Sequence, residues 1–149
     1  MNVPTFRATA LLVLLLSTVV SGAAAAEPSA AEWRYLQCVD AVGKVGEQLQ
    51  RATENNGWAN RELMTYAYEL TRFNAAQLRR WDAPVPELES AHHQLIHVLD
   101  LAARHYEALA RGNFGDAEDR GEDLKREYQR FEKQWKVVMG RYESAADSK

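Results

Sequence analysis

The feature that most constrains the fold of this 149-residue chain is a seven-residue repeat of apolar side chains, which recurs in four stretches. Within each stretch the apolar residues are spaced alternately by four and three positions, which places them on one face of an α-helix. No stretch shows the sustained alternation of apolar and polar residues that a half-buried strand requires. The sequence therefore predicts an all-α protein.

Turn-forming residues separate the four stretches. An Asn-Asn-Gly turn ends at Gly57, Pro84 and Pro86 follow the second stretch, and Gly112 follows the third. Proline cannot donate the helical hydrogen bond, and glycine and asparagine tolerate left-handed backbone, so helices end at such residues. We expect helices over residues 29–54, 58–81, 86–111 and 113–142.

The apolar stripes define the core that the sequence predicts. In the second helix the stripe is Leu63, Ala67, Leu70, Asn74, Gln77 and Trp81. In the fourth helix it is Ala117, Gly121, Leu124, Tyr128, Phe131, Trp135, Val138 and Tyr142. Charged side chains fill the opposite face of the fourth helix, as is typical of a solvated surface.

The lengths of the connections predict the topology. Short connections between long helices make neighbouring helices antiparallel, and a seven-residue repeat implies a left-handed supercoil. We therefore expect an antiparallel up-down-up-down four-helix bundle, left-handed and heptad-patterned, that forms one domain over residues 27–149. The alternative is an open pair of helical hairpins that closes only as a dimer, so the chain is expected to be a monomer or a homodimer.

Residues 1–26 have the pattern of a secretory signal peptide. Arg7 supplies a positive charge, residues 8–20 form an apolar run, and small residues follow up to Ala26. Cleavage near Ala26 would place the mature protein in the periplasm or outside the cell. An uncleaved membrane anchor is the alternative, but this run is shorter than the roughly 20 residues that a membrane span needs. After removal of the signal we expect no membrane span.

Composition narrows the possible functions. The net charge is −3 and no basic block is present, so the sequence gives no sign of nucleic-acid binding. Cys38 is the only cysteine, which rules out a disulfide within the chain. We expect Cys38 to be a small buried core residue; the alternative is a disulfide between two chains.

No motif for catalysis or for a cofactor is found. The haem-attachment pattern Cys-x-x-Cys-His, the Gly-x-Ser-x-Gly nucleophile elbow and a glycine-rich phosphate loop are all missing from the sequence. We therefore expect no enzymatic activity, no catalytic residues and no cofactor.

All four histidines lie in the third helix. His92 falls within the apolar stripe, and we expect it to be buried and hydrogen-bonded to Gln77 or Asn74. His93 and His97 lie one turn apart on the outer face, a spacing that can supply two ligands to zinc, copper or nickel. Two ligands do not complete a metal site. Metal handling in the periplasm with these two histidines is kept as the alternative function and is not the favoured one.

The favoured function comes from one end of the predicted bundle. An up-down-up-down topology gathers five apolar residues there. Trp33 and Leu36 lie largely off the stripe of the first helix, and the others are Trp81 at the end of the second helix, Val85 between the two prolines, and Met139 beside the stripe of the fourth helix. An exposed apolar patch commonly marks an interaction site, and tryptophan is enriched in binding hot spots. We expect a non-enzymatic binding or structural protein that holds an unknown partner protein or an apolar small ligand at this end. The alternative is that these residues only close the bundle, with Trp33 folded onto Met139.

Overall fold

A computed structural model of the chain describes residues 28–53 and 57–146, and all the regular structure in these ranges is helical. The predicted signal peptide and two turn residues, Asn55 and Asn56, lie outside the described residues. The helices fall close to the predicted ranges, although α2 ends earlier than expected and α4 continues further. The elements are α1 (Ala30–Thr53), a short 3-10 helix η1 (Gly57–Ala59), α2 (Arg61–Leu78), α3 (Pro86–Ala110) and α4 (Phe114–Ala146).

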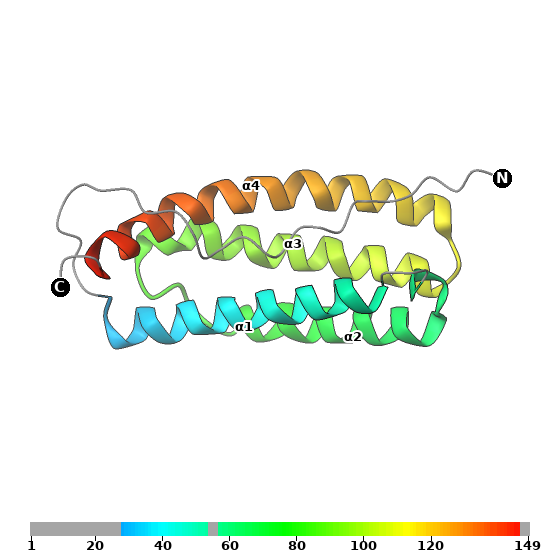
Figure 1. Cartoon of the computed structure of the whole chain (residues 1–149), viewed down its shortest axis with the longest axis horizontal. Coiled ribbons are helices and arrows are strands. Elements are labelled where there is room, and N and C mark those ends of the chain that lie inside the picture. The colour runs from blue at the N-terminus through cyan, green and yellow to red at the C-terminus, as the bar shows by residue number, and fades with distance from the viewer. Residues whose placement is uncertain (1–27, 54–56, 147–149) are drawn as a thin grey trace.

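The four long helices pack against each other (Figure 1). Helix α3 packs against both α2 and α4, and α1 lies beside α2. In the view of Figure 1, α1 and α3 begin at the left of the molecule and α4 ends there. Within the described ranges, none of the helices combines the length and the apolar character needed to cross a membrane.

Local chemistry explains where the helices begin and end. The side chain and backbone of Ser29 exchange hydrogen bonds with Glu32 at the start of α1, forming a capping box. Gly112 follows α3 with a φ of 71°, in the left-handed region that favours glycine, so its predicted role as a C-terminal cap is confirmed. A Cβ atom on Gly57 would lie 2.3 Å from the carbonyl oxygen of Ala52, so the turn after α1 requires glycine at this position.

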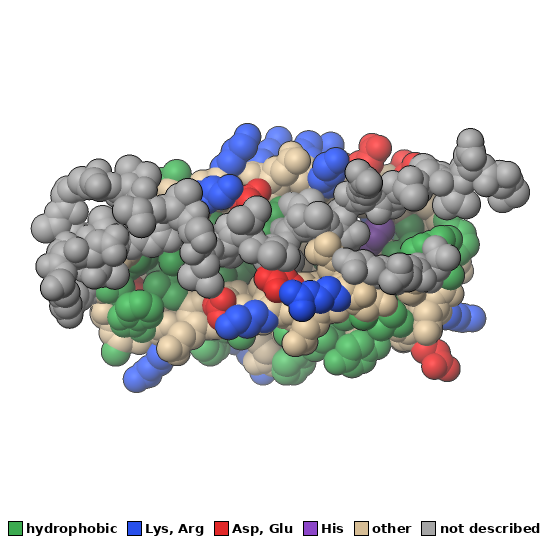
Figure 2. All heavy atoms as spheres, in the orientation of Figure 1, with side chains coloured by type: hydrophobic (Ala, Val, Ile, Leu, Met, Phe, Trp, Pro, Cys, Tyr) green, Lys and Arg blue, Asp and Glu red, His purple; other side chains and the backbone are tan. Residues whose placement is uncertain are grey.

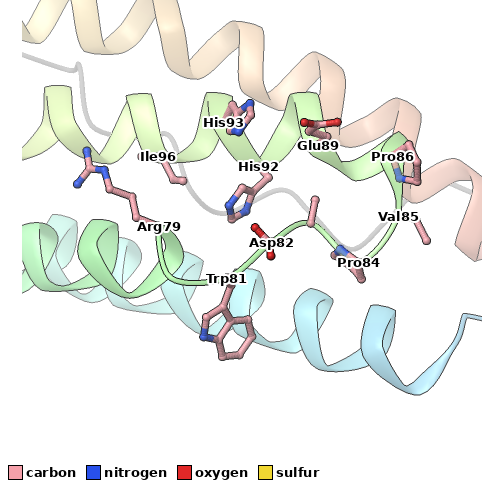
Figure 3. A pocket seen from close by; sticks show the side chains of 11 residues that line it. Arg79, Trp81, Asp82, Pro84, Val85, Pro86, Glu89, His92, His93 and Ile96 are labelled. Atoms are coloured by element: carbon pink, nitrogen blue, oxygen red, sulfur yellow. The ribbon is translucent and has the colours of Figure 1, made fainter.

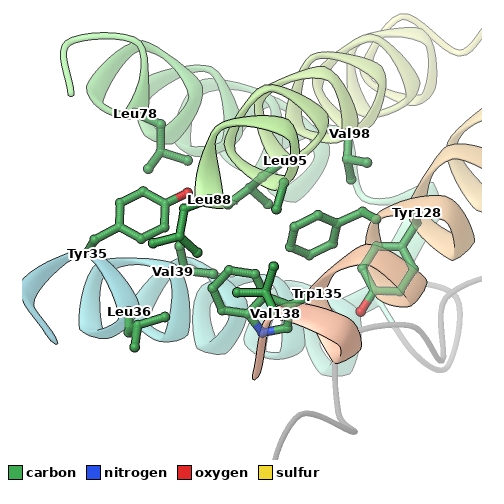
Figure 4. Packing of buried hydrophobic residues seen from close by; sticks show 12 residues of the cluster. Tyr35, Leu36, Val39, Leu78, Leu88, Leu95, Val98, Tyr128, Trp135 and Val138 are labelled. Atoms are coloured by element: carbon green, nitrogen blue, oxygen red, sulfur yellow. The ribbon is translucent and has the colours of Figure 1, made fainter. Parts of the chain in front are cut away.

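Two groups of buried side chains form the core. The larger group includes residues of all four helices and is rich in aromatic rings (Figure 4). In it, the rings of Phe131 and Trp135 stack with centroids 5.8 Å apart. The smaller group lies where α1 ends, α2 begins and α3 ends, and consists of Leu49, Met64, Ala67 and Tyr106. The larger group closes the end of the molecule at which the functional surface was predicted.

The predicted inward face of α2 is wrong. Of the six residues assigned to it, only Ala67 is buried, and Trp81 lies beyond the end of the helix and is exposed. Leu70 and Gln77 are only half-buried. The helix is rotated so that its buried residues are Met64, Ala67, Thr71, Ala75 and Leu78.

The core face of α1 also differs from the prediction. Leu36, which was expected outside the core, is 6% exposed and packs in the larger group with Tyr35 and Val39. Cys38 is half-buried rather than fully buried. The physical reason is that Tyr35, Leu36 and Val39 pack with side chains of α3 and α4, so that Cys38 and Val42 are turned toward α2.

Candidate functional site

The five residues predicted at the apolar end divide into two groups. Trp33 and Trp81 are exposed, with 53% and 45% of their surface accessible. Val85 and Met139 are half-buried against the larger core group, and Leu36 is buried within it. Of these five residues, only the two tryptophans are therefore exposed.

A hollow of about 520 Å³ lies where the chain passes from α2 to α3 (Figure 3). Pro84 and Pro86 prevent the helix from continuing, and Val85 between them has an extended backbone with φ −142° and ψ 151°. The connection therefore stands away from the first turns of α3 and leaves space between them. The apolar and aromatic lining consists of Trp81, Ala83, Pro84, Val85, Pro86 and Ile96.

Charged and polar groups surround this α2–α3 hollow. Asp82, Glu89 and His93 line it and are exposed, so they remain solvated at its rim. Arg79 also lines the hollow, but its guanidinium forms an ion pair with Asp100 of α3. The rim can therefore accept and donate hydrogen bonds, while the walls offer apolar surface.

His92 forms the buried floor of the hollow. Its side chain is 4% exposed, and its Nδ1 atom lies 3.1 Å from the hydroxyl oxygen of Tyr35 in α1. Burial, followed by the nearby His93, lowers the pKa of His92, whereas the Trp81 backbone and Asp82 act in the opposite direction. The ring is therefore neutral at pH 7. We assign its proton to Nε2, which leaves Nδ1 able to accept from the Tyr35 hydroxyl.

The predicted hydrogen bond of His92 with Gln77 or Asn74 is wrong. The ring is buried as expected, but the partner is Tyr35, because α1 turns this side chain toward α3. Gln77 and Asn74 instead line a second depression between α1 and α2. The buried polar contact therefore joins α1 to α3 rather than α2 to α3.

His93 and His97 are exposed, as the sequence predicts. His93 lines the α2–α3 hollow and His97 does not, so the two side chains do not converge on one cavity. In the part of the chain that the structure describes, no three or more His, Cys, Asp or Glu side chains are grouped so that they could hold a metal ion. The metal hypothesis therefore still rests on two ligands.

The second depression, the α1–α2 groove, has a volume of about 280 Å³ and was not foreseen. Trp81 lines this groove as well as the α2–α3 hollow, so this residue connects the two. The sequence carries a signal for this groove, because Cys38, Val42 and Val45 have the heptad spacing of one apolar face of α1. The lining residues are Cys38, Ala41, Val42, Val45, Asn74, Gln77, Leu78 and Trp81.

Two further exposed aromatic residues were also missed. Tyr66 and Phe73 of α2 are 60% and 58% exposed. They are seven residues apart and therefore lie on the same face of the helix. This spacing is present in the sequence, but the prediction assigned a single apolar stripe to the second helix.

Comparisons of the chain with protein-family models, with curated proteins and with solved structures found no match. Apolar residues of the α2–α3 connection line the hollow, and carboxylate and imidazole groups at its rim can orient a bound molecule. This combination suits binding.

Proposed function

We propose that the protein is an exported, non-enzymatic binding protein that holds a partner protein or an apolar ligand at the α2–α3 hollow. The observation that carries this proposal is the exposure of Trp81 on the wall shared by the hollow and the α1–α2 groove. A large aromatic side chain beside a concave surface offers a bound group much apolar contact at little cost in conformational entropy. The volume of the hollow lies within the range of about 300–1,000 Å³ that is usual for ligand sites.

The proposal includes a left-handed, antiparallel up-down-up-down bundle. The short connections between helices and the helix directions in Figure 1 support it. In this topology Trp33 and Trp81 belong to the same end of the molecule, so a protein partner larger than the hollow can contact both. A small apolar ligand would contact Trp81 alone.

Replacing Trp81 by alanine tests the binding site directly. We expect the mature wild-type protein to bind the neutral apolar dye Nile red, and Trp81→Ala to weaken this binding about tenfold, because the variant removes an exposed aromatic side chain that belongs to both the hollow and the adjoining groove. Dye fluorescence in a protein titration measures the affinity. The free energy of unfolding should change by less than about 1 kcal/mol, because the side chain is already exposed.

Phe114→Ala is the matched control for Trp81→Ala. Phe114 is similarly exposed, but it packs edge-on against Trp58 near the start of α4, away from the hollow. We expect this variant to keep the wild-type affinity for the dye. Equal losses in both variants, or no dye binding by the wild type, would contradict the proposed site.

Export is tested by the mass of the mature protein. After expression of the full chain in a bacterial host, we expect the exported product to begin near Glu27, because small residues precede this position. Intact-mass spectrometry of the purified product identifies the first residue. A membrane-bound product that retains residues 1–20 would show that the segment is an anchor and that this part of the proposal is wrong.

A further inference from the structure

Between the buried Met64 and Leu78 near its two ends, helix α2 faces the core with small side chains and exposes two large aromatic ones. Ala67, Thr71 and Ala75 are buried against the rest of the molecule, whereas Tyr66 and Phe73 are exposed. A helix that packs only within its own chain ordinarily buries its large apolar side chains. The outer face of α2 therefore carries more apolar surface than is usual for a helix face that contacts only solvent. Figure 2 shows hydrophobic side chains along the lower edge of the molecule, where α1 and α2 lie.

The two exposed aromatic side chains of α2 form a heptad pattern with two half-buried ones, Leu70, which also contacts the smaller core group, and Gln77. Tyr66, Leu70, Phe73 and Gln77 are spaced four, three and four residues apart. With about 100° of rotation per residue, they fall within about 60° of one another on the helix. This is the spacing with which one helix packs along another helix. We call these four residues the outer seam of α2.

We propose that the outer seam packs against the outer seam of a second copy of this chain, with the two α2 helices antiparallel across a two-fold axis. This inference goes beyond the proposed function, because the seam residues Tyr66, Leu70 and Phe73 do not line the α2–α3 hollow. The partner is a second copy because the seam is complementary to itself in packing and in charge, as the register shows.

The antiparallel register follows from the seam. Leu70 lies level with the second copy's Phe73, and Tyr66 lies level with the second copy's Gln77, when the two-fold axis passes between residues 71 and 72. Gln77 lines the α1–α2 groove. The second copy's Tyr66 therefore lies at the open side of that groove, which can receive its ring.

Charge supports the same register. In it, Glu62 at the start of α2 lies within about one residue of the level of the second copy's Arg80, just past the end of α2. Neither Glu62 nor Arg80 has an ion-pair or hydrogen-bond partner on its side chain within the described ranges. Glu69 lies level with the second copy's Asn74, so no like charges oppose each other there.

Sedimentation equilibrium of the full mature protein tests the dimer. We expect the wild type to dissociate reversibly from dimer to monomer on dilution, and Phe73→Ala to raise the dissociation constant at least tenfold. Val137→Ala is the matched control, because Val137 is also exposed but lies on α4. We expect it to leave the dissociation constant unchanged.

Charge reversal identifies the partner as a second copy in this register. Glu62→Arg and Arg80→Glu should each weaken the dimer severalfold, and the double variant should restore it, because the attraction is then re-formed with opposite signs.

Circular dichroism verifies that each variant is folded, and the charge variants carry the test if Phe73→Ala does not fold. A monomeric wild type at all concentrations, equal effects of Phe73→Ala and Val137→Ala, or no rescue in the double variant would overturn the inference. Nile red binding at the hollow should persist in Phe73→Ala, so failure of the dimer is distinguishable from failure of the proposed function.

Discussion

Phe131→Ala is expected to lower the free energy of unfolding by about 3–5 kcal/mol. The ring is 4% exposed, stacks on Trp135 and lies 6.2 Å from the ring of Tyr128, centroid to centroid. Its removal leaves a cavity between α3 and α4 that the remaining rings cannot fill. Urea denaturation followed by circular dichroism measures the loss, and an unchanged slope against urea would show that the denatured state is unaffected.

Two leucines of α3 provide a matched comparison for this effect. Leu88 is completely buried, whereas Leu99 is half-buried beside the same core group. Leu88→Ala should therefore cost about 3–5 kcal/mol and Leu99→Ala clearly less, about 1–2 kcal/mol. A cost below about 1 kcal/mol for both Phe131→Ala and Leu88→Ala would mean that the buried faces are wrongly assigned.

The fourth helix was predictable because its sequence carries one apolar stripe. Tyr128, Phe131, Trp135 and Val138 are all buried, as the heptad spacing indicates. The rest of the α4 surface is densely charged, so no second face competes for the core. Large apolar side chains on one side and charges on the other leave one way to pack the helix.

The second helix was not predictable in the same way, because it carries two apolar stripes. Periodicity locates both stripes but does not say which one faces the core. The large residues Leu70 and Trp81 favoured the wrong stripe. The structure instead buries Ala67, Thr71 and Ala75, whose small side chains suit a close approach of α2 to α3. Tertiary packing therefore decides the orientation.

The candidate site was predictable only in part. The exposure of Trp81 follows from its position just before a proline-rich connection, and the burial of His92 follows from its place in a stripe. The hollow depends on the path of the connection between α2 and α3, which has no periodicity. The partner of His92 depends on the rotation of α1, which brings in Tyr35 from a distant part of the sequence.

Tyr35→Phe is expected to lower the free energy of unfolding by about 1–3 kcal/mol at pH 7.5. The reason is that Nδ1 of His92 loses its donor while the ring stays buried. The double variant Tyr35→Phe/His92→Leu removes both polar partners and should be closer to the wild type than Tyr35→Phe alone, because no buried polar group is then left unpaired. Urea denaturation of the wild type, the single variants Tyr35→Phe and His92→Leu, and the double variant completes a double-mutant cycle and measures the coupling between the two side chains.

The same contact predicts how stability depends on pH. Burial is the main cause of a lowered pKa for both His92 and His105, and the Nδ1 atom of His105 donates to the carbonyl oxygen of Ala117 at 2.8 Å. In the unfolded chain both imidazoles regain a pKa of about 6.5, so the unfolded state takes up protons first as the pH falls through that value. The free energy of unfolding should therefore be highest above about pH 7 and should decrease as the pH falls from about 7 toward 5.5.

The double variant identifies the source of this pH dependence. Because it retains His105 but lacks the imidazole of His92, its free energy of unfolding should fall less steeply over the same pH range than that of the wild type. Protonation of His92 would also turn Nδ1 from an acceptor into a donor, so the Tyr35 hydroxyl would have to accept and its own proton would lose its acceptor. A stability that rises as the pH falls, or an equal slope in the wild type and the double variant, would contradict a neutral, buried His92 held by Tyr35.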